Sequence, residues 1–295
     1  MSRLQIRALH RLEEFHECER IQRVVWGNVG VGSEVLAVTA KHGGAVLGAV
    51  VDGRIVGCLY AFLARRRGRL IHWSHIMAVE PPYRDRGLGF QMKLAHRRLA
   101  LQQGLRSICW TYDPLQSRNA ALNIARLGAQ VEEYIPDCYG RFTSSIEKSL
   151  PSDRFVVNWR IASPSVELRL RRGVPPCRTD FSLLPRVNET QVNAKGFLEN
   201  RTISLSLRAR RVLVEIPPNT DAMRAQDLKL AWRWRTDTRR IFQHYFAAGY
   251  QVEDFLLPTL EGSRKCFYLL HRQKLALTAR GSTMVSPGGS CCRLQ

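Results

Sequence analysis

The sequence predicts an α/β fold with one mixed sheet flanked by helices, followed by a second, smaller α/β domain. Two observations support this prediction. Two β-rich runs flank Asp52 and Gly53, a dipeptide that favours the tight turn of a hairpin. After residue 69, extended runs alternate with runs of helical spacing, as they do in strand–helix–strand crossovers. A chain with both hairpins and crossovers is expected to form a mixed sheet.

The first half of the chain reads in the order β-α-β-β-β-α-β-α-β. Strands have alternating or β-branched apolar residues, and helices place apolar residues three or four apart. The expected strands are 3–9, the hairpin 45–63, 69–79, 106–112 and 130–135, and the expected helices are 10–26, 87–103 and 115–129.

We divide the chain into a domain at 1–150, a second α/β domain at 151–274 and a flexible tail at 275–295. The second domain is expected to contain strands at 151–161 and 165–172 and a helix at 221–247. "LGAQVEEYI" at 127–135 aligns without a gap with "AGYQVEDFL" at 248–256. The similarity is either a coincidence or a degenerate copy of the last strand–helix–strand part of the first domain. We favour the copy because the elements also follow in the same order.

Composition limits the classes of partner. The net charge is +20, the pI is about 10.4, and 38 of the 45 basic residues are arginine. Such a chain attracts phosphates, whether in nucleic acid, at a membrane surface or in an anionic cofactor. No aromatic residues are interleaved with the basic runs, which argues against a nucleic-acid partner.

No apolar run has the length of a membrane span and the first residues lack a secretory signal, so we expect a cytoplasmic protein without a membrane partner. The eight cysteines form no CxxC pair, so we expect neither a metal nor a disulfide framework.

The stretch "VEPPYRDRGLGFQMK" at 79–93 joins an expected strand to an expected helix through a charged, glycine-containing turn. It is either a solvated turn or a cradle for a phosphorylated ligand. The first turn of a helix presents free N–H groups and the positive end of the helix dipole. Glycine lets the backbone approach a diphosphate closely. The stretch matches neither a Walker loop nor the dinucleotide fingerprint.

The longer segment "IMAVEPPYRDRGLGFQM" resembles the signature of the GNAT superfamily of acyl-CoA-dependent N-acyltransferases, in which a strand ends in valine, proline follows two positions later, and Q/R-x-x-G-x-G/A opens a helix. The resemblance spans about residues 3–145. It implies acetyl-CoA or another acyl-CoA as co-substrate, no metal, and a thioester admitted where the strands 69–79 and 106–112 splay apart. The implied cofactor-binding residues are Met77, Ala78, Val79, Arg84, Asp85, Arg86, Gly87, Leu88, Gly89, Phe90 and Asn119.

The resemblance implies an N-acyltransferase that moves an acetyl or other acyl group to a primary amine by direct attack in a ternary complex. "WTYDPLQSRNAALNIARLGA" and "LPSDRFVVNW" resemble a bacterial group of predicted acyltransferases, some of whose relatives are linked to N-acylation of amino acids, so an amino acid or other small amine is the expected acceptor. The alternatives are an inactive acyl-CoA-binding module and a basic nucleic-acid-binding protein. The oligomeric state stays open, with a homodimer as one option.

Two residues are candidates for the general base, Glu80 at the end of the strand 69–79 and His75 within it. Regular alternation places His75, Met77 and Val79 on one face and Ser74, Ile76 and Glu80 on the other, unless a bulge resets the pleat. The tyrosine that often serves as general acid in the family is replaced by Ile124. Either Tyr139 or Tyr112 substitutes for it, or water protonates the leaving thiolate.

Overall fold

The structure is a computed structural model that describes residues 4–27, 30–140, 150–173, 181–257, 259–260 and 263–272. The predicted tail at 275–295 lies outside the described residues. The first half contains β1 (Leu4–Ala8), α1 (Leu12–Trp26), α2 (Ser33–Lys41), β2 (Ala45–Val51), β3 (Arg54–Arg66), β4 (Arg69–Val79), η1 (Pro81–Tyr83), α3 (Leu88–Gln102), β5 (Ile108–Tyr112), α4 (Ser117–Ala120), the π-helical η2 (Ala121–Arg126) and β6 (Gln130–Ile135). The remainder contains β7 (Arg154–Trp159), α5 (Pro164–Arg172), η3 (Phe181–Leu183), β8 (Asn188–Val192), β9 (Leu198–Ile203), β10 (Arg211–Glu215), α6 (Thr220–Gln226), α7 (Leu228–Ala247), β11 (Tyr250–Leu256), β12 (Thr259–Leu260), β13 (Ser263–Arg264) and β14 (Phe267–Arg272).

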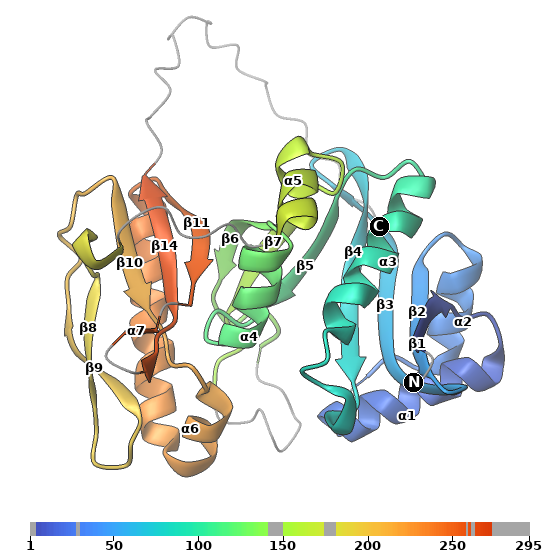
Figure 1. The fold of residues 1–295 in the computed structure, drawn as a ribbon, viewed down its shortest axis with the longest axis horizontal. Coiled ribbons are helices and arrows are strands. Elements are labelled where there is room, and N and C mark those ends of the chain that lie inside the picture. The colour runs from blue at the N-terminus through green and yellow to red at the C-terminus, as the bar shows by residue number, and fades with distance from the viewer. Residues whose placement is uncertain are drawn as a thin grey trace, which may run out of the picture.

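The main sheet has seven strands in the order β1-β2-β3-β4-β5-β7-β6 (Figure 1). Neighbours are antiparallel except β4 and β5, which run parallel because α3 connects them as a crossover. The mixed α/β sheet predicted from the sequence is therefore confirmed. The hairpin between β2 and β3 turns at Asp52 and Gly53, whose φ angles of 48° and 83° are both positive. A type I′ turn requires this geometry.

Helices cover both faces of the β1–β4 half of the sheet. On one face, Phe15 and Ile21 of α1 and Leu36 of α2 pack in a cluster with the β2–β4 side chains Val46, Cys58 and Ala78. On the other face, Leu88 and Met92 of α3 pack on Ala45, Leu47 and Leu59. The helix α2 was not predicted, because "SEVLAVTAK" is short and follows a glycine-rich break.

The smaller sheet, β10-β14-β11, repeats the topology of β5-β7-β6. In each sheet, a helical segment connects the two outer strands, β5 to β6 in one and β10 to β11 in the other. The last strand of each unit, β7 or β14, lies between these two strands and is antiparallel to both. A bulge interrupts β6 between Val131 and Glu133 and β11 between Val252 and Asp254, which are aligned positions in the two matching sequence stretches. A shared bulge at aligned positions is what a repeated unit predicts.

Two strand predictions after residue 150 need correction. β7, which we placed in the second domain, pairs with β5 and β6 and so belongs to the first sheet. The boundary at residue 150 therefore cuts that sheet before its last strand. The run 165–172 lies within helix α5, not in a strand. Ser163 caps this helix by accepting a hydrogen bond from the Val166 amide, Pro164 occupies its first turn, and arginines fill its last turn.

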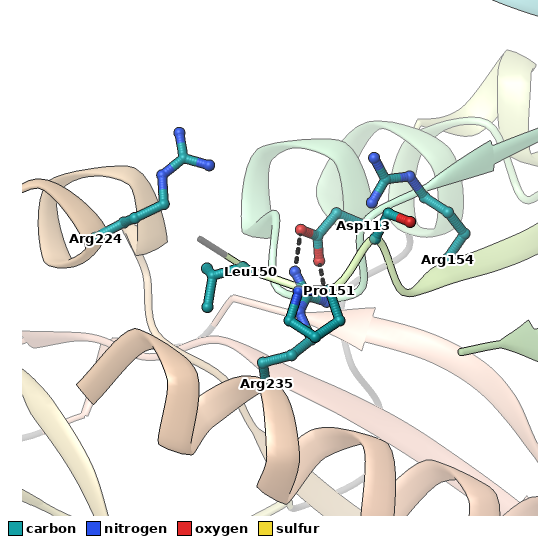
Figure 2. Close-up of a pocket in the computed structure, with 7 residues that line it drawn as sticks. Asp113, Leu150, Pro151, Arg154, Arg224 and Arg235 are labelled. Atoms are coloured by element: carbon teal, nitrogen blue, oxygen red, sulfur yellow. Dashed lines mark hydrogen bonds and ion pairs between the residues drawn. The ribbon is translucent and has the colours of Figure 1, made fainter. Parts of the chain in front are cut away.

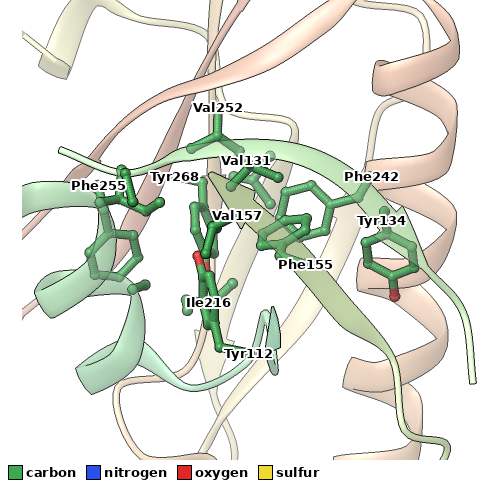
Figure 3. Close-up of a cluster of buried hydrophobic side chains, with 14 of the residues drawn as sticks. Tyr112, Val131, Tyr134, Phe155, Val157, Ile216, Phe242, Val252, Phe255 and Tyr268 are labelled. Atoms are coloured by element: carbon green, nitrogen blue, oxygen red, sulfur yellow. The ribbon is translucent and has the colours of Figure 1, made fainter. Parts of the chain in front are cut away.

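One aromatic cluster joins the two sheets (Figure 3). Phe155 of β7 and Tyr268 of β14 hold equivalent places in the two units, and their rings meet at 5.5 Å and 88°. Phe242 of α7 packs edge-on against both of these rings, at 4.8 Å and 5.4 Å. Because these rings are fully buried, the two units share one core.

Two arginines one turn apart on α7 attach this helix to the first sheet. Arg235 forms a two-pronged ion pair with Asp113, just after β5, and Arg239 pairs with Asp153, just before β7. Burial acts to raise the pKa of each carboxyl, but the arginines outweigh it and hold both pKa values below the ordinary range. The smaller unit, which consists of β10, β11 and β14 with the helices α6 and α7, therefore holds the end of β5 and the start of β7 in place. Both of these strand ends border the site described below.

None of the helices in the described part of the chain combines the length and apolar character needed to cross a bilayer.

Replacing Phe155 with alanine should lower the free energy of unfolding by about 3 to 5 kcal/mol, because the cavity would open between both sheets. We expect one cooperative urea transition shifted to lower denaturant, measured by tryptophan fluorescence and circular dichroism. Leu183→Ala is the control, since that side chain is 80% exposed and should change stability by less than about 0.5 kcal/mol. Two separated transitions in the wild-type protein would contradict a shared core.

Candidate active site

The strands β4 and β5 separate after a short parallel contact. They pair only at His72 with Ile108 and at Trp73 with Cys109, whereas β4 continues to Val79 and β5 to Tyr112. The outer edges of both strands stay paired, β4 with β3 and β5 with β7. The facing backbone groups beyond residue 73 are therefore open to a ligand, as the resemblance implied for the thioester and its pantetheine arm.

A bulge in β4 changes which side chains face the opening. The register with β3 shifts so that Tyr60 pairs with Ile76 and Ala61 with Ser74, leaving His75 as the extra residue. Ser74 then shares the α3 face with Met77 and Val79. His75 lies on the α1 face against Tyr60 and Phe62, with ring centroids 6.1 and 6.2 Å apart. The regular alternation that grouped His75 with Met77 and Val79 is wrong because of this bulge.

The turn before α3 has the backbone geometry of an anion cradle. Asp85 and Gly87 have φ angles of 60° and 79°, and Gly87 precedes the first helical residue. The first-turn amides of Leu88, Gly89 and Phe90 have no carbonyl partner within the helix. Open space lies where a side chain at Gly87 would begin. These amides and the helix dipole favour a phosphate here.

The predicted cofactor residues surround this turn in different ways. Arg84 donates from Nε to the Val79 carbonyl at 3.0 Å. The Arg86 guanidinium lies over the Tyr83 ring at 5.6 Å, and Asp85 pairs with Arg118 of α4 at 3.5 Å. Phe90 lies under Arg126, and Ala78 is buried in the α1 cluster. The side chains of Ala78 and Phe90 thus serve packing, and only their backbone groups are available to a cofactor.

A cavity of about 610 Å³ fills the opening between β4 and β5. This volume suits a small-molecule site. Four of the predicted site residues line it: His75, Met77, Arg84 and Asn119. Burial beside Tyr60 and Phe62 lowers the pKa of His75. The ring can therefore accept a proton near neutral pH.

Glu80 does not line this cavity. Its side chain is only 5% exposed, and its carboxylate accepts hydrogen bonds from Arg20 at 2.6 Å and from Arg54 at 3.0 Å. Glu80 joins α1 and the start of β3 to the end of β4. We therefore do not retain Glu80 as the base. The sequence could not show this, because both arginines are distant from Glu80 in the chain.

Lys93 lines the cavity and was missed from the sequence. Its side chain emerges from α3 below the opening, where Nζ donates to Ser74 Oγ at 3.0 Å and lies 3.8 Å from the centre of the Trp110 ring. The residue is 3% exposed, and burial lowers its pKa to about 7. Among the described residues, no carboxylate forms an ion pair with Lys93. The available signal was a lysine directly after Met92 on the apolar side of an expected helix.

A π-turn changes the residue that faces the cavity from the helix after β5. The Leu127 amide donates to the Leu122 carbonyl, five residues back, within η2. Asn123 lines the cavity, while Ile124, at the position of the family's usual tyrosine, is buried in the core. π-turns occur often at functional sites. Nearby, the Tyr139 hydroxyl lies 2.6 Å from Thr111 Oγ1, and both residues line the cavity.

Tyr112 is less suited to proton donation. Its hydroxyl lies 3.3 Å from that of Tyr268, inside the shared core, and burial raises its pKa. Of the two tyrosines considered as acids, Tyr139 is the more accessible, with 43% of its surface exposed.

The end of the cavity next to α6 is lined by residues of both units. Arg154 of β7 and Arg224 of α6 project beside the Asp113–Arg235 pair (Figure 2). Among the described residues, Arg154 has no ion-pair partner, and Arg224 has only a 3.8 Å contact with Asp221. This end of the cavity therefore carries positive charge that can bind an anionic group.

The described part of the chain contains no cluster of three or more histidine, cysteine or acidic side chains that could hold a metal ion.

Glu80→Gln should destabilise the fold, because it removes the charge that Arg20 and Arg54 share near the sheet. Breaking a buried ion pair costs about 3 to 5 kcal/mol, and the partial exposure of both arginines should place the loss below this range. Thermal unfolding gives the measurement. Affinity for CoA should stay within about threefold of wild type, since Glu80 is off the cavity. An unchanged melting temperature with lost activity would restore Glu80 as a base.

Lys93→Met should alter the pH dependence of stability. A buried lysine with a lowered pKa binds fewer protons than in the unfolded chain between about pH 7 and pH 10.5, so its contribution to stability rises with pH. Subtracting the Lys93→Met curve from that of wild type should leave a slope approaching about 1.4 kcal/mol per pH unit in this window. Lys229→Met on the exposed side of α7 should leave no such difference. Parallel curves for wild type and Lys93→Met would show that Lys93 is not buried in the folded chain.

Comparison with known proteins gives one family. Residues 7–129 match the model of the acetyltransferase (GNAT) family. A search of curated proteins found no match.

Among solved structures, a GNAT-family acetyltransferase from Streptococcus pneumoniae is 18% identical, with a TM-score of 0.43 over 53% of this chain and 98% of that chain. The ribosomal-protein-S18-alanine N-acetyltransferase of Escherichia coli is 12% identical, with a TM-score of 0.45 over 55% and 96%. The yncA protein of Salmonella typhimurium, solved with acetyl-CoA, is 16% identical, with a TM-score of 0.42 over 55% and 96%. Residues 7–129 of this chain therefore match the GNAT acetyltransferase family.

Proposed function

We propose that the protein transfers an acyl group from acyl-CoA to the primary amine of a small acceptor, in a ternary complex. The observation that carries the proposal is the continuity of the site. The amides at the start of α3 lead along the free edge of β4 into the 610 Å³ cavity between β4 and β5. The pyrophosphate would bind the amides of residues 85–90, and the pantetheine arm would pair with the backbone of residues 77–79. Asn119, on the opposite wall, would contact the cofactor from α4.

His75 is proposed as the base. The bulge places its ring on the cavity wall, and its lowered pKa leaves the ring neutral at pH 7. The ring would take a proton from the acceptor ammonium, directly or through water. The free amine would attack the thioester carbonyl, and the carbon–sulfur bond would break to give an amide and the CoA thiolate, while the nitrogen releases its second proton to solvent. Tyr139 or water would then protonate the thiolate.

The acceptor is proposed to carry a carboxylate, as an amino acid does. Arg154 and Arg224 form a cationic wall on the β7 and α6 side of the cavity, and their guanidinium groups suit a carboxylate. Because Arg224 belongs to α6, the smaller unit would complete the acceptor site.

The cofactor site is tested with Gly87→Asp, which places a carboxylate where the pyrophosphate is proposed to bind. We expect the dissociation constant for CoA, measured by calorimetry, to rise by about tenfold or more, the equivalent of about 1.4 kcal/mol of repulsion. Gly53→Asp is a matched control, because Gly53 has a φ of 83° and equally open surroundings in the β2–β3 turn. Equal affinities in both variants would reject the cradle.

The reaction is tested by release of CoA thiol with a panel of amino acids and amines that lack a carboxylate. Arg224→Ala should raise KM for amino acids by about tenfold or more with little effect on simple amines, since a charge-assisted hydrogen bond contributes about 1.5 to 3 kcal/mol. Arg240→Ala, on the exposed part of α7, is the control. Binding of acyl-CoA without turnover of any acceptor would favour the inactive module, for which the replacement of the usual tyrosine by Ile124 is the supporting observation.

A further inference from the structure

The cavity floor below the β4–β5 opening is basic and lacks a counter-charge. Lys93 of α3 lines the cavity, whereas His96 of α3 and His72 of β4 are buried beside it without lining the cavity; each of the three is less than 4% exposed. His72 Nδ1 and His96 Nε2 are 3.0 Å apart, and the other nitrogen of His72 meets the Gly43 carbonyl at 3.0 Å. His96 Nδ1 has no hydrogen-bond partner. Among the described residues, no carboxylate forms an ion pair with any of the three.

Lys93 is the member of this group that reaches the ligand space. It lines the cavity, as do the two residues that its ammonium contacts, Ser74 and Trp110. An ammonium has three N–H donors, and only the bond to Ser74 occupies one of them with an oxygen. Taking a lysine into a protein interior without an oppositely charged partner is costly. A counter-charge supplied by the ligand would offset that cost.

The position of Lys93 identifies which part of the ligand would supply this charge. Ser74 precedes the bulge of β4, and Trp110 lies one residue beyond the last β4–β5 pair. These residues form the narrow end of the opening, on the side opposite Arg154 and Arg224. A thioester that enters between the strands points its acyl chain toward this narrow end, while the acceptor approaches from the wider one.

We propose that the donor is the CoA thioester of a short dicarboxylic acid, such as succinyl-CoA, and that Lys93 binds the terminal carboxylate of its acyl group. This inference rests on the proposed function, because it assumes that acyl-CoA enters between β4 and β5. Ser74 Oγ adds a second donor beside Lys93, and the Trp110 ring shields the ion pair from water. Binding charges Lys93 fully, since a proton from solvent joins Nζ when the carboxylate arrives. His72 and His96, the other titratable groups beside it, stay neutral because burial lowers the pKa of both.

Calorimetry compares succinyl-CoA with butyryl-CoA, which has the same number of acyl carbons and no carboxylate. The wild-type protein should bind succinyl-CoA at least about tenfold more tightly, as a charge-assisted contact predicts. Titrations at pH 8 in buffers of different ionisation enthalpy should show uptake of close to one proton with succinyl-CoA and none with butyryl-CoA. Lys93→Met should reverse the preference, and Lys229→Met should retain it.

The outcomes separate this inference from the proposed function. Binding of both thioesters with equal affinity and without proton uptake overturns the role of Lys93 and leaves the acyltransferase proposal standing. Failure to bind CoA or any thioester overturns both. If Lys93→Met slows transfer from both donors equally and keeps the preference for succinyl-CoA, Lys93 serves the chemistry and not donor selection, which also overturns the inference. Proton uptake by the wild-type protein decides the matter even if Lys93→Met does not fold.

Discussion

The candidate site exists because β4 and β5 stop pairing after two residues. Parallel strands in a sheet ordinarily satisfy each other's backbone groups along their shared length. Here the crossover through α3 brings the strands together only at His72 and Trp73, and the remaining part of each strand is held from its outer side. An opening of this kind in the middle of a sheet would collapse without that outer support. The α3 turn, the cavity and the buried lysine are all placed by this separation.

The outer support of β5 comes from β7, which the smaller unit holds in place. β7 pairs along all of β5, and its Phe155 enters the core that Tyr268 and Phe242 complete. Arg235 and Arg239 of α7 hold the end of β5 and the start of β7 through buried carboxylates. The smaller unit thus stabilises one wall of the opening and contributes Arg224 to its rim. The repeated sheet can thus support the site that the first sheet forms.

Charge is distributed unevenly within the cavity. The wide end is lined by two arginines, and the narrow end is lined by a buried lysine that has two buried histidines beside it. In the narrow end desolvation lowers the pKa of each base, so the charge depends on what is bound. The net charge of +20 gave no indication of this difference.

Local patterns in the sequence were sufficient for most elements of the first sheet. The turn at Asp52 and Gly53, the helix after Gly87 and the resemblance to the GNAT family all depend on residues close together in the chain. The segment 165–172 was misassigned as a strand, although the cap that makes it a helix, Ser163 and Pro164, is itself local.

Tertiary structure alone decided which side chains meet. Glu80 sits beside the cradle in sequence, but Arg20 and Arg54 occupy its carboxylate. The bulge that turns His75 into the cavity is a matter of register between β3 and β4, which no single strand encodes. In the sequence, Lys93 does not differ from the other charged residues of the helix. In the folded chain it is buried against Ser74 and Trp110. The sequence therefore determined most of the first sheet and indicated the proposed cofactor site, because both follow from contiguous motifs. The catalytic and selective groups depend on contacts between distant segments, and these only the folded chain defines.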